Sequence, residues 1–226
     1  MEGEQQAEQE LSLWTAETPE DVLELLGRGA NLEERDSQAN TPLIAATRAA
    51  NPNVVTQLLD SGADVLAKEA TGWDSLAVAS QMGNIEIVNI LLSRRANANS
   101  ITNNGLTPIM IATFFNRPAI VSALLDGGAN IEITNVNGYT VLMIAVQHGM
   151  TDIARTLLER GANVNAATKM GNTSLIIATR ESRLDIIPIL LLHGADPFLA
   201  NNEGKTALDL CPSDQVRVLL TPPSVA

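Results

Sequence analysis

The sequence predicts an all-α solenoid in which helix–turn–helix repeats are joined by β-hairpin loops. Three features share a period of 33 residues along the 226-residue chain. They are a Gly-Ala pair, a Leu-Leu pair just before it, and a threonine motif after it. A fixed period of this length is typical of stacked repeats that bury a continuous core between neighbours.

The threonine motif marks the expected start of the first helix of each repeat. Asp74-Ser75-Leu76 fills one place in the series, and its other members are Thr41-Pro42-Leu43, Thr107-Pro108-Ile109, Thr140-Val141-Leu142, Thr173-Ser174-Leu175 and Thr206-Ala207-Leu208. A threonine side chain can cap the free N–H groups of a helix, and Pro42 stands where its missing donor costs nothing. Small residues such as Ala45 and Ala46 then allow neighbouring helices to approach closely.

The second helix of each repeat is predicted from apolar residues at helical spacing, as in Val54, Val55, Leu58 and Leu59. Pro188 lies inside the corresponding segment of the sixth repeat, where the sequence predicts a mild kink.

The Gly-Ala pair marks the end of the second helix, because glycine can adopt the left-handed conformation found there. It occurs at Gly29-Ala30, Gly62-Ala63, Gly128-Ala129, Gly161-Ala162 and Gly194-Ala195. Arg95-Ala96 takes the remaining place, so Arg95 is predicted to be strained by about 1 kcal/mol. Asn104-Gly105 and Asn137-Gly138 then supply the positive dihedrals of tight hairpins.

This pattern resembles the ankyrin repeat over residues 11–220. The resemblance divides the chain into an acidic tail at 1–10, seven repeats at about 11–35, 36–68, 69–101, 102–134, 135–167, 168–200 and 201–220, and a tail at 221–226. The end repeats are expected to present polar outer faces, with Glu17, Glu20, Asp21 and Glu24 at one end and Asp209, Asp214 and Arg217 at the other.

The chain departs from the family pattern at the position after the threonine motif, where a histidine is usual. The residues found there are Ile44, Ala77, Met110, Met143, Ile176 and Asp209. We therefore expect packing to replace the recurrent histidine hydrogen bond.

Composition excludes several classes of function. A formal net charge of -12 argues against a nucleic-acid binder. The lone Cys211 fits a reducing compartment, and neither a secretory signal nor a membrane span is visible. We expect a cytoplasmic protein, with the nucleus as the alternative. Residues 1–36 hold eleven acidic and two basic side chains, which indicates either a solubilising end or a patch for a basic partner.

The sequence offers no set of catalytic or metal-ligating residues. His148, His193 and Cys211 lie in different repeats at unrelated spacings. His193 precedes a glycine, which is typical of a helix C-terminus. No phosphate-binding glycine loop or calcium loop is visible. We expect a protein that is not an enzyme, with no cofactor, metal or small-molecule substrate.

The resemblance implies a binding surface on the inner, concave face, formed by the hairpins and the ends of the first helices. The apolar and neutral residues placed there are Trp73, Gln81, Met82, Leu106, Phe114, Phe115, Tyr139 and His148. The basic residues placed there are Arg35, Arg48, Lys68, Lys169, Arg180 and Lys205. Exposed aromatic residues in a concavity are typical of binding hot spots. The alternative is that Phe114 and Phe115 turn inward and fill space.

The sequence therefore predicts a non-catalytic protein–protein interaction module or adaptor that binds an acidic or amphipathic partner segment on this face. Two alternatives remain open. One is a structural subunit of a large assembly, whose outer helices would also be covered. The other is a regulator or assembly chaperone of an enzyme complex.

Overall fold

The computed structural model describes residues 12–220. The predicted acidic tail at 1–10 and the tail at 221–226 lie outside the described residues. The chain forms two compact parts, Met1–Pro108 and Ile109–Ala226, here called the N-terminal half and the C-terminal half.

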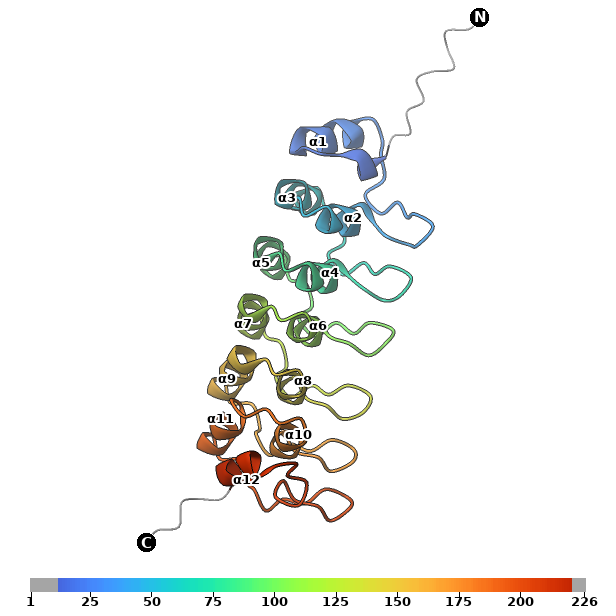
Figure 1. Ribbon diagram of the computed structural model, residues 1–226. Helices are drawn as coiled ribbons and strands as arrows, with labels where there is room; N and C mark the ends of the chain where they lie inside the picture. Colours follow the sequence, from blue (N-terminus) through green and yellow to red (C-terminus); the bar gives the residue numbers. More distant parts are fainter. Residues whose placement is uncertain (1–11, 221–226) are drawn as a thin grey trace, which may run out of the picture. The chain divides into compact units, whose positions relative to one another are not determined.

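The N-terminal half is built from short helices in two rows. Its elements are the 3-10 helix η1 (Leu13–Thr15) and the α-helices α1 (Pro19–Gly27), α2 (Pro42–Arg48), α3 (Pro52–Asp60), α4 (Ser75–Met82) and α5 (Ile85–Ser93). In Figure 1, α2 and α4 lie beside the hairpin loops, whereas α1, α3 and α5 form the second row. Each helix packs on its partner and on its counterpart one repeat away.

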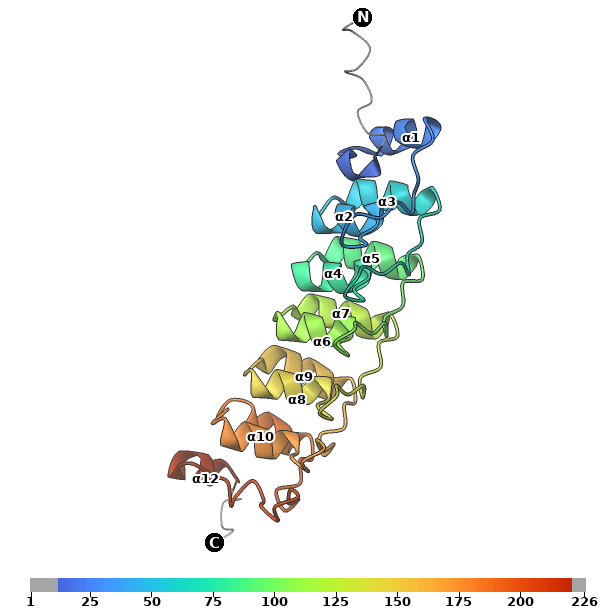
Figure 2. The same cartoon turned by 90° about the vertical axis from the view of Figure 1, so that its right-hand side faces the viewer.

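The C-terminal half repeats this arrangement. Its elements are α6 (Pro108–Phe114), which begins at the last residue of the N-terminal half, then α7 (Pro118–Asp126), α8 (Val141–Gln147), α9 (Thr151–Glu159), α10 (Ser174–Arg180), α11 (Ile187–Leu192) and α12 (Asp214–Leu220). Here α8 packs on α9 and α10, and α10 packs on α11. Figure 2 shows the paired helices α8 and α9 lying alongside each other.

The first helices begin where the sequence predicts. The threonine side chains of Thr41, Thr140 and Thr173 accept hydrogen bonds from backbone N–H groups three residues later, at 3.3–3.4 Å. Asp74 makes the same contact with the Ala77 N–H at 2.8 Å. These bonds satisfy donors that a helix start would otherwise leave free.

The hairpin loops are β-like without forming a sheet among residues 12–220. Isolated antiparallel bridges close three of them, at Lys68 and Asp74, Thr134 and Thr140, and Ala167 and Thr173. Neighbouring tips are joined by backbone bonds, such as Ala70 N–H to Gln38 O at 3.0 Å. The fold is an all-α solenoid of helix–turn–helix repeats with hairpin loops, as the sequence predicts.

A further periodic feature was missed by sequence reasoning. After each Gly-Ala or Arg-Ala pair, an Asn or Asp side chain accepts a hydrogen bond from the N–H two residues later, at 2.8–3.0 Å. The six residues are Asn31, Asp64, Asn97, Asn130, Asn163 and Asp196. Such turns are a usual role of short polar side chains, and the period of 33 was the available signal.

The core is aliphatic and follows the repeat. Ile44, Ala77, Met110, Met143 and Ile176 are at most 1% exposed, so packing does replace the family's histidine at these places. The expectation is wrong for Asp209, which is exposed. Its carboxylate accepts hydrogen bonds from the Thr206 N–H at 2.9 Å and the Thr206 hydroxyl at 2.8 Å.

Backbone geometry confirms one expectation and corrects another. Arg95 has φ of 66° and is left-handed as predicted. Pro188 does not kink a helix, because α11 begins at Ile187 and the proline stands in its first turn. A proline nitrogen cannot donate to the Leu184 carbonyl, so residues 184–186 form a turn where other repeats have already become helical.

The terminal repeats expose most of the expected polar residues, and they expose apolar residues as well. Asp21 forms a capping box with Thr18 at the start of α1, but Leu23 on the same helix is 56% exposed. In the last repeat, Leu208 and Val218 are 37% and 70% exposed. The residues equivalent to Leu208 in earlier repeats, such as Leu43 and Leu76, are buried. Each of those repeats is followed by another repeat.

Candidate functional site

Three rings form an exposed aromatic cluster in the C-terminal half, composed of Phe114, Phe115 and His148. The Phe114 ring centroid lies 5.5 Å from that of Phe115 and 5.3 Å from that of His148, both in edge-to-face geometry. Phe114 is 57% exposed and Phe115 is 40% exposed. The alternative that these phenylalanines turn inward is therefore wrong.

The exposure of the two phenylalanines follows from the end of α6. Thr113 faces the core and is fully buried, so the next two residues of the turn point away from it. Asn116 then adopts φ of 52°, and Arg117 N–H returns to the Ala112 carbonyl at 2.8 Å. This left-handed ending holds the backbone beneath both rings.

Tyr139 and Leu106 occupy equivalent hairpin positions and are half-buried. The Tyr139 N–H donates to the Asn135 side chain at 3.1 Å, and the Leu106 N–H donates to the Thr102 hydroxyl at 3.1 Å. Among residues 12–220, ring–ring contacts occur within the aromatic cluster, and Tyr139 and Trp73 take part in none.

In the N-terminal half, predicted site residues line a hollow of about 180 Å³, here called the Trp73 hollow. Its lining residues are Arg48 from the end of α2, Gln81 from α4, and Glu69, Thr71 and Trp73 from the hairpin. Met82, next to Gln81, is 49% exposed. Sequence reasoning placed Arg48, Trp73 and Gln81 on this face, and Thr71 as a hairpin tip, but missed Glu69.

Several of the predicted basic residues already have partners. The Lys68 ammonium donates to the Ile101 carbonyl at 2.7 Å, and Arg35 donates to the Lys68 carbonyl at 2.7 Å. These two side chains tie successive hairpins together. Arg180 pairs with the neighbouring Glu181 at 3.3 Å.

Lys169 and Lys205 are exposed in the C-terminal half. Hydrogen bonds from Thr206 lower the pKa of Asp209, and the nearby charge of Lys205 lowers that pKa further. Asn40 and Asn172, which occupy the hairpin position equivalent to Trp73 and Tyr139, are only 6% and 8% exposed. Their side chains bond Asp36 and Asn201 instead.

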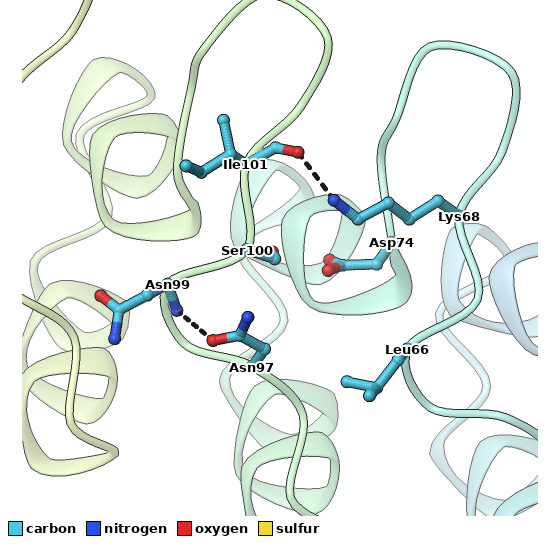
Figure 3. Close-up of a pocket in the computed structure, with 7 residues that line it drawn as sticks. All are labelled: Leu66, Lys68, Asp74, Asn97, Asn99, Ser100 and Ile101. Atoms are coloured by element: carbon cyan, nitrogen blue, oxygen red, sulfur yellow. Dashed lines mark hydrogen bonds between the residues drawn. The ribbon is translucent and has the colours of Figure 1, made fainter.

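A second hollow, of about 300 Å³, lies between two hairpin stems of the N-terminal half (Figure 3). It is lined by Leu66, Lys68, Asp74, Asn97, Asn99, Ser100 and Ile101. Elsewhere the residue equivalent to Leu66 reaches the next turn, as when Glu33 accepts from the Asp64 N–H at 2.7 Å. Leu66 has no such acceptor, so this hollow is explained by an interrupted contact between repeats.

The part of the chain that the structure describes contains no group of three or more His, Cys, Asp or Glu residues placed to hold a metal ion. Within the same range, every helix is too short or too polar to cross a membrane. His193 caps the end of α11, as its place before a glycine predicts, and its ring lies 2.8 Å from the Ile189 carbonyl.

Comparison with known families agrees with the repeat geometry. A family model of ankyrin repeats in three copies matches residues 13–102 and 76–168, and a single ankyrin-repeat model matches residues 170–202. The chain belongs to the ankyrin repeat family. Members of this family are generally protein–protein interaction modules.

Solved ankyrin structures are similar over most of the chain. The ankyrin repeat domain of Bcl-3, described as a unique member of the IkappaB protein family, is 26% identical with a TM-score of 0.84. That match covers 89% of this chain and 91% of the Bcl-3 chain. The human ASB11 ankyrin repeat domain is 28% identical with a TM-score of 0.78, covering 91% and 95% respectively. A search of curated proteins gave no match.

Proposed function

We propose that this ankyrin protein is a non-catalytic adaptor that binds a partner segment through its hairpins and first-helix ends. The observation that carries the proposal is the aromatic cluster of Phe114, Phe115 and His148. Large apolar side chains that stay exposed next to one another are typical of binding hot spots. Burying both phenylalanine rings against a partner would contribute several kcal/mol, at about 25 cal/mol per Å² of apolar surface.

The nature of the partner segment is part of the proposal. An amphipathic segment would place apolar side chains on the aromatic cluster and acidic side chains near Lys169 and Lys205. Both lysines are exposed in the C-terminal half, whereas Arg180 is already paired with Glu181. The lysines would act mainly on the association rate, because charges steer encounter. We place the protein in the cytoplasm, with the nucleus as the alternative, because its single cysteine fits a reducing compartment.

Permanent incorporation into a large assembly is the second candidate. It is favoured by apolar side chains exposed away from the aromatic cluster, notably Leu192 at 81% and Val218 at 70%. An assembly subunit would bury these residues as well as the phenylalanines. Regulation or assembly of an enzyme complex is one form that either role could take.

Quantitative affinity capture with the full chain tests the proposal. The variant is Phe114→Ser with Phe115→Ser, and the matched control is Leu192→Ser, which removes a more exposed apolar side chain from an outer helix. We expect the double variant to lose at least about tenfold of its partner capture, since a hot spot contributes about 2 kcal/mol.

The control variant is expected to capture partners like the original chain. Loss of the same partners in both variants would favour the assembly subunit instead. Undiminished capture by the double variant would contradict the proposed surface.

A further inference from the structure

The Trp73 hollow contains the carboxylate of Glu69, which does not make the hydrogen bond that the equivalent residues of the other repeats make. Glu69 begins its hairpin, and the five equivalent residues are Asp36, Thr102, Asn135, Thr168 and Asn201. In each of these hairpins, the side-chain oxygen accepts a hydrogen bond from the N–H four residues later, at 2.9–3.1 Å. The Trp73 N–H makes no such bond to Glu69 among the hydrogen bonds of residues 12–220.

Glutamate is one methylene longer than aspartate, and the Glu69 carboxylate bonds Thr71 instead of the N–H four residues later. One oxygen accepts hydrogen bonds from the Thr71 N–H at 3.3 Å and from the Thr71 hydroxyl. The second oxygen has no hydrogen bond within the described range. Glu69 is only 9% exposed, so this acceptor is recessed in the wall of the hollow.

The other groups of the hollow define what a ligand would meet. Trp73 is half-buried and contributes an aromatic ring, and Gln81 contributes a half-buried amide. Arg48 brings a positive charge, whose field also reaches Asp36. Hydrogen bonds from Asn40 lower the pKa of Asp36, and the charge of Arg48 lowers that pKa further.

The charge of the N-terminal half favours a cation. Residues 1–108 hold 16 acidic and 6 basic side chains, a net charge of -10, whereas the C-terminal half carries only -2. Two of the six basic residues, Arg35 and Lys68, are bound to backbone carbonyl groups. A positively charged ligand would therefore be attracted to this half of the molecule.

We propose that the Trp73 hollow binds an arginine side chain of a basic segment in a partner protein. The guanidinium plane would stack on the Trp73 ring and donate to the recessed Glu69 carboxylate. Arginine fits better than lysine, because its planar fork suits both a carboxylate and an aromatic face. The inference rests on the proposed adaptor function and adds a second contact to it. This contact would take a basic side chain of the partner, whereas Lys169 and Lys205 would take acidic ones.

A titration of the full chain with short peptides tests this inference. The probes are acetyl-Gly-Ser-Arg-Ser-Gly-amide and the same peptide with citrulline, the uncharged analogue of arginine, or with glutamate. The readout is the indole N–H signal of Trp73 in a nuclear magnetic resonance spectrum, assigned with Trp73→Phe. We expect the arginine peptide to shift this signal with at least about fivefold higher affinity than either other peptide.

Two variants test the charges with opposite signs. Glu69→Gln keeps an oxygen for Thr71 but removes the charge, and should weaken the arginine peptide about fivefold. Arg48→Ala removes a competing cation from an exposed position, so it should strengthen binding of the same peptide. Glu86→Gln, an exposed acid on α5, is the matched control and should leave the titration unchanged.

Tighter binding of the glutamate peptide, or weaker arginine binding in Arg48→Ala, would overturn the inference. The Arg48→Ala arm remains decisive even where Glu69→Gln lowers the unfolding midpoint. A titration in which the arginine peptide leaves the Trp73 signal unshifted would also overturn the inference. It leaves the capture experiment on Phe114 and Phe115 unaffected, because the probes are free peptides and the readout is Trp73. If the capture experiment failed, it would contradict the surface at Phe114 and Phe115 and would not change the result of the titration at Trp73.

Discussion

Arg95 shows at the scale of one residue how the repeat tolerates an exception. The five glycines that occupy the equivalent position have φ between 86° and 98°. Arg95 is held at 66° by the same ending, in which Ala96 N–H bonds the Leu91 carbonyl at 3.0 Å. Its side chain is exposed and makes no hydrogen bond or ion pair within residues 12–220, so no such interaction offsets the backbone strain.

Arg95→Gly is therefore expected to raise the free energy of unfolding by about 0.5 to 1 kcal/mol. Denaturant unfolding followed by circular dichroism measures the change. Arg94→Gly is the matched control and should destabilise, because Arg94 has φ of -97° and pairs with Asp60 at 2.6 Å. A lower midpoint for Arg95→Gly would show that the arginine makes a contact worth keeping.

Asp36 gives the first hairpin a dependence on pH. The Asn40 side chain, the largest cause, lowers the pKa of Asp36, and the N–H groups of Asn40 and Gln38 add to this effect. A lowered folded-state pKa stabilises the protein above the unfolded pKa of about 3.9, and this contribution is lost as the pH falls through the folded value.

Asp36→Asn should make stability fall less steeply below about pH 4, and at pH 7 it should lose the contribution that the ionised carboxylate makes there. Asparagine already serves in the equivalent place at Asn135 and Asn201. Unfolding midpoints between pH 3 and pH 7 measure the slope, with Asp185→Asn as a control at an exposed residue that accepts no recorded hydrogen bond. An acid dependence identical to that of the original chain would refute the role of Asp36.

At the scale of the element, glycine is needed in hairpins and at helix ends for different physical reasons. Gly62 and Gly72 both have positive φ, at 97° and 83°. A Cβ added to Gly62 would meet open space, whereas one added to Gly72 would lie 2.7 Å from the backbone nitrogen of Asn103. The helix-end glycine satisfies a dihedral, and the hairpin glycine also lets the next hairpin approach.

Gly72→Ala should therefore destabilise the protein more than Gly62→Ala. We expect about 1 kcal/mol for Gly62→Ala from the dihedral alone, and about 2 to 4 kcal/mol for Gly72→Ala, where the backbone of the next hairpin must also move. Denaturant unfolding of both variants compares them directly. Equal losses would mean that the two hairpins are not held in contact.

The elements that the sequence could predict are those that one repeat specifies by itself. Thr41 and Asp74 marked helix starts, and the left-handed Arg95 followed from one broken series. Contacts with the next repeat were harder to foresee. In the sequence, Lys68 and Arg35 look like charges available to a partner. In the structure, each side chain donates to a backbone carbonyl 33 positions further along the chain.

Site residues divide in the same way. Phe114 and Phe115 were placed on the binding face by repeat phase, and their exposure confirms that they point outward. Glu69 was not foreseen, because only comparison with the five other hairpins shows that its carboxylate leaves the usual bond unmade. A glutamate in a series of Asp, Asn and Thr was the available signal.

At the scale of the whole molecule, two compact halves differ in chemistry more than in fold. The N-terminal half carries most of the negative charge and the Trp73 hollow, and the C-terminal half carries the aromatic cluster. Because each repeat contacts only its neighbours, stability in such a fold is a sum of local terms. Surface residues can therefore vary without loss of the fold, and binding is expected to depend on a few of them.

Site-specific photo-crosslinking in cells tests the central claim most directly. Benzoylphenylalanine is placed at position 115 in one form of the full chain and at position 192 in another. Our account predicts partner adducts from position 115, beside the exposed Phe114 ring, and none from position 192 on the outer helix α11. Adducts from position 192 without adducts from position 115 would contradict it.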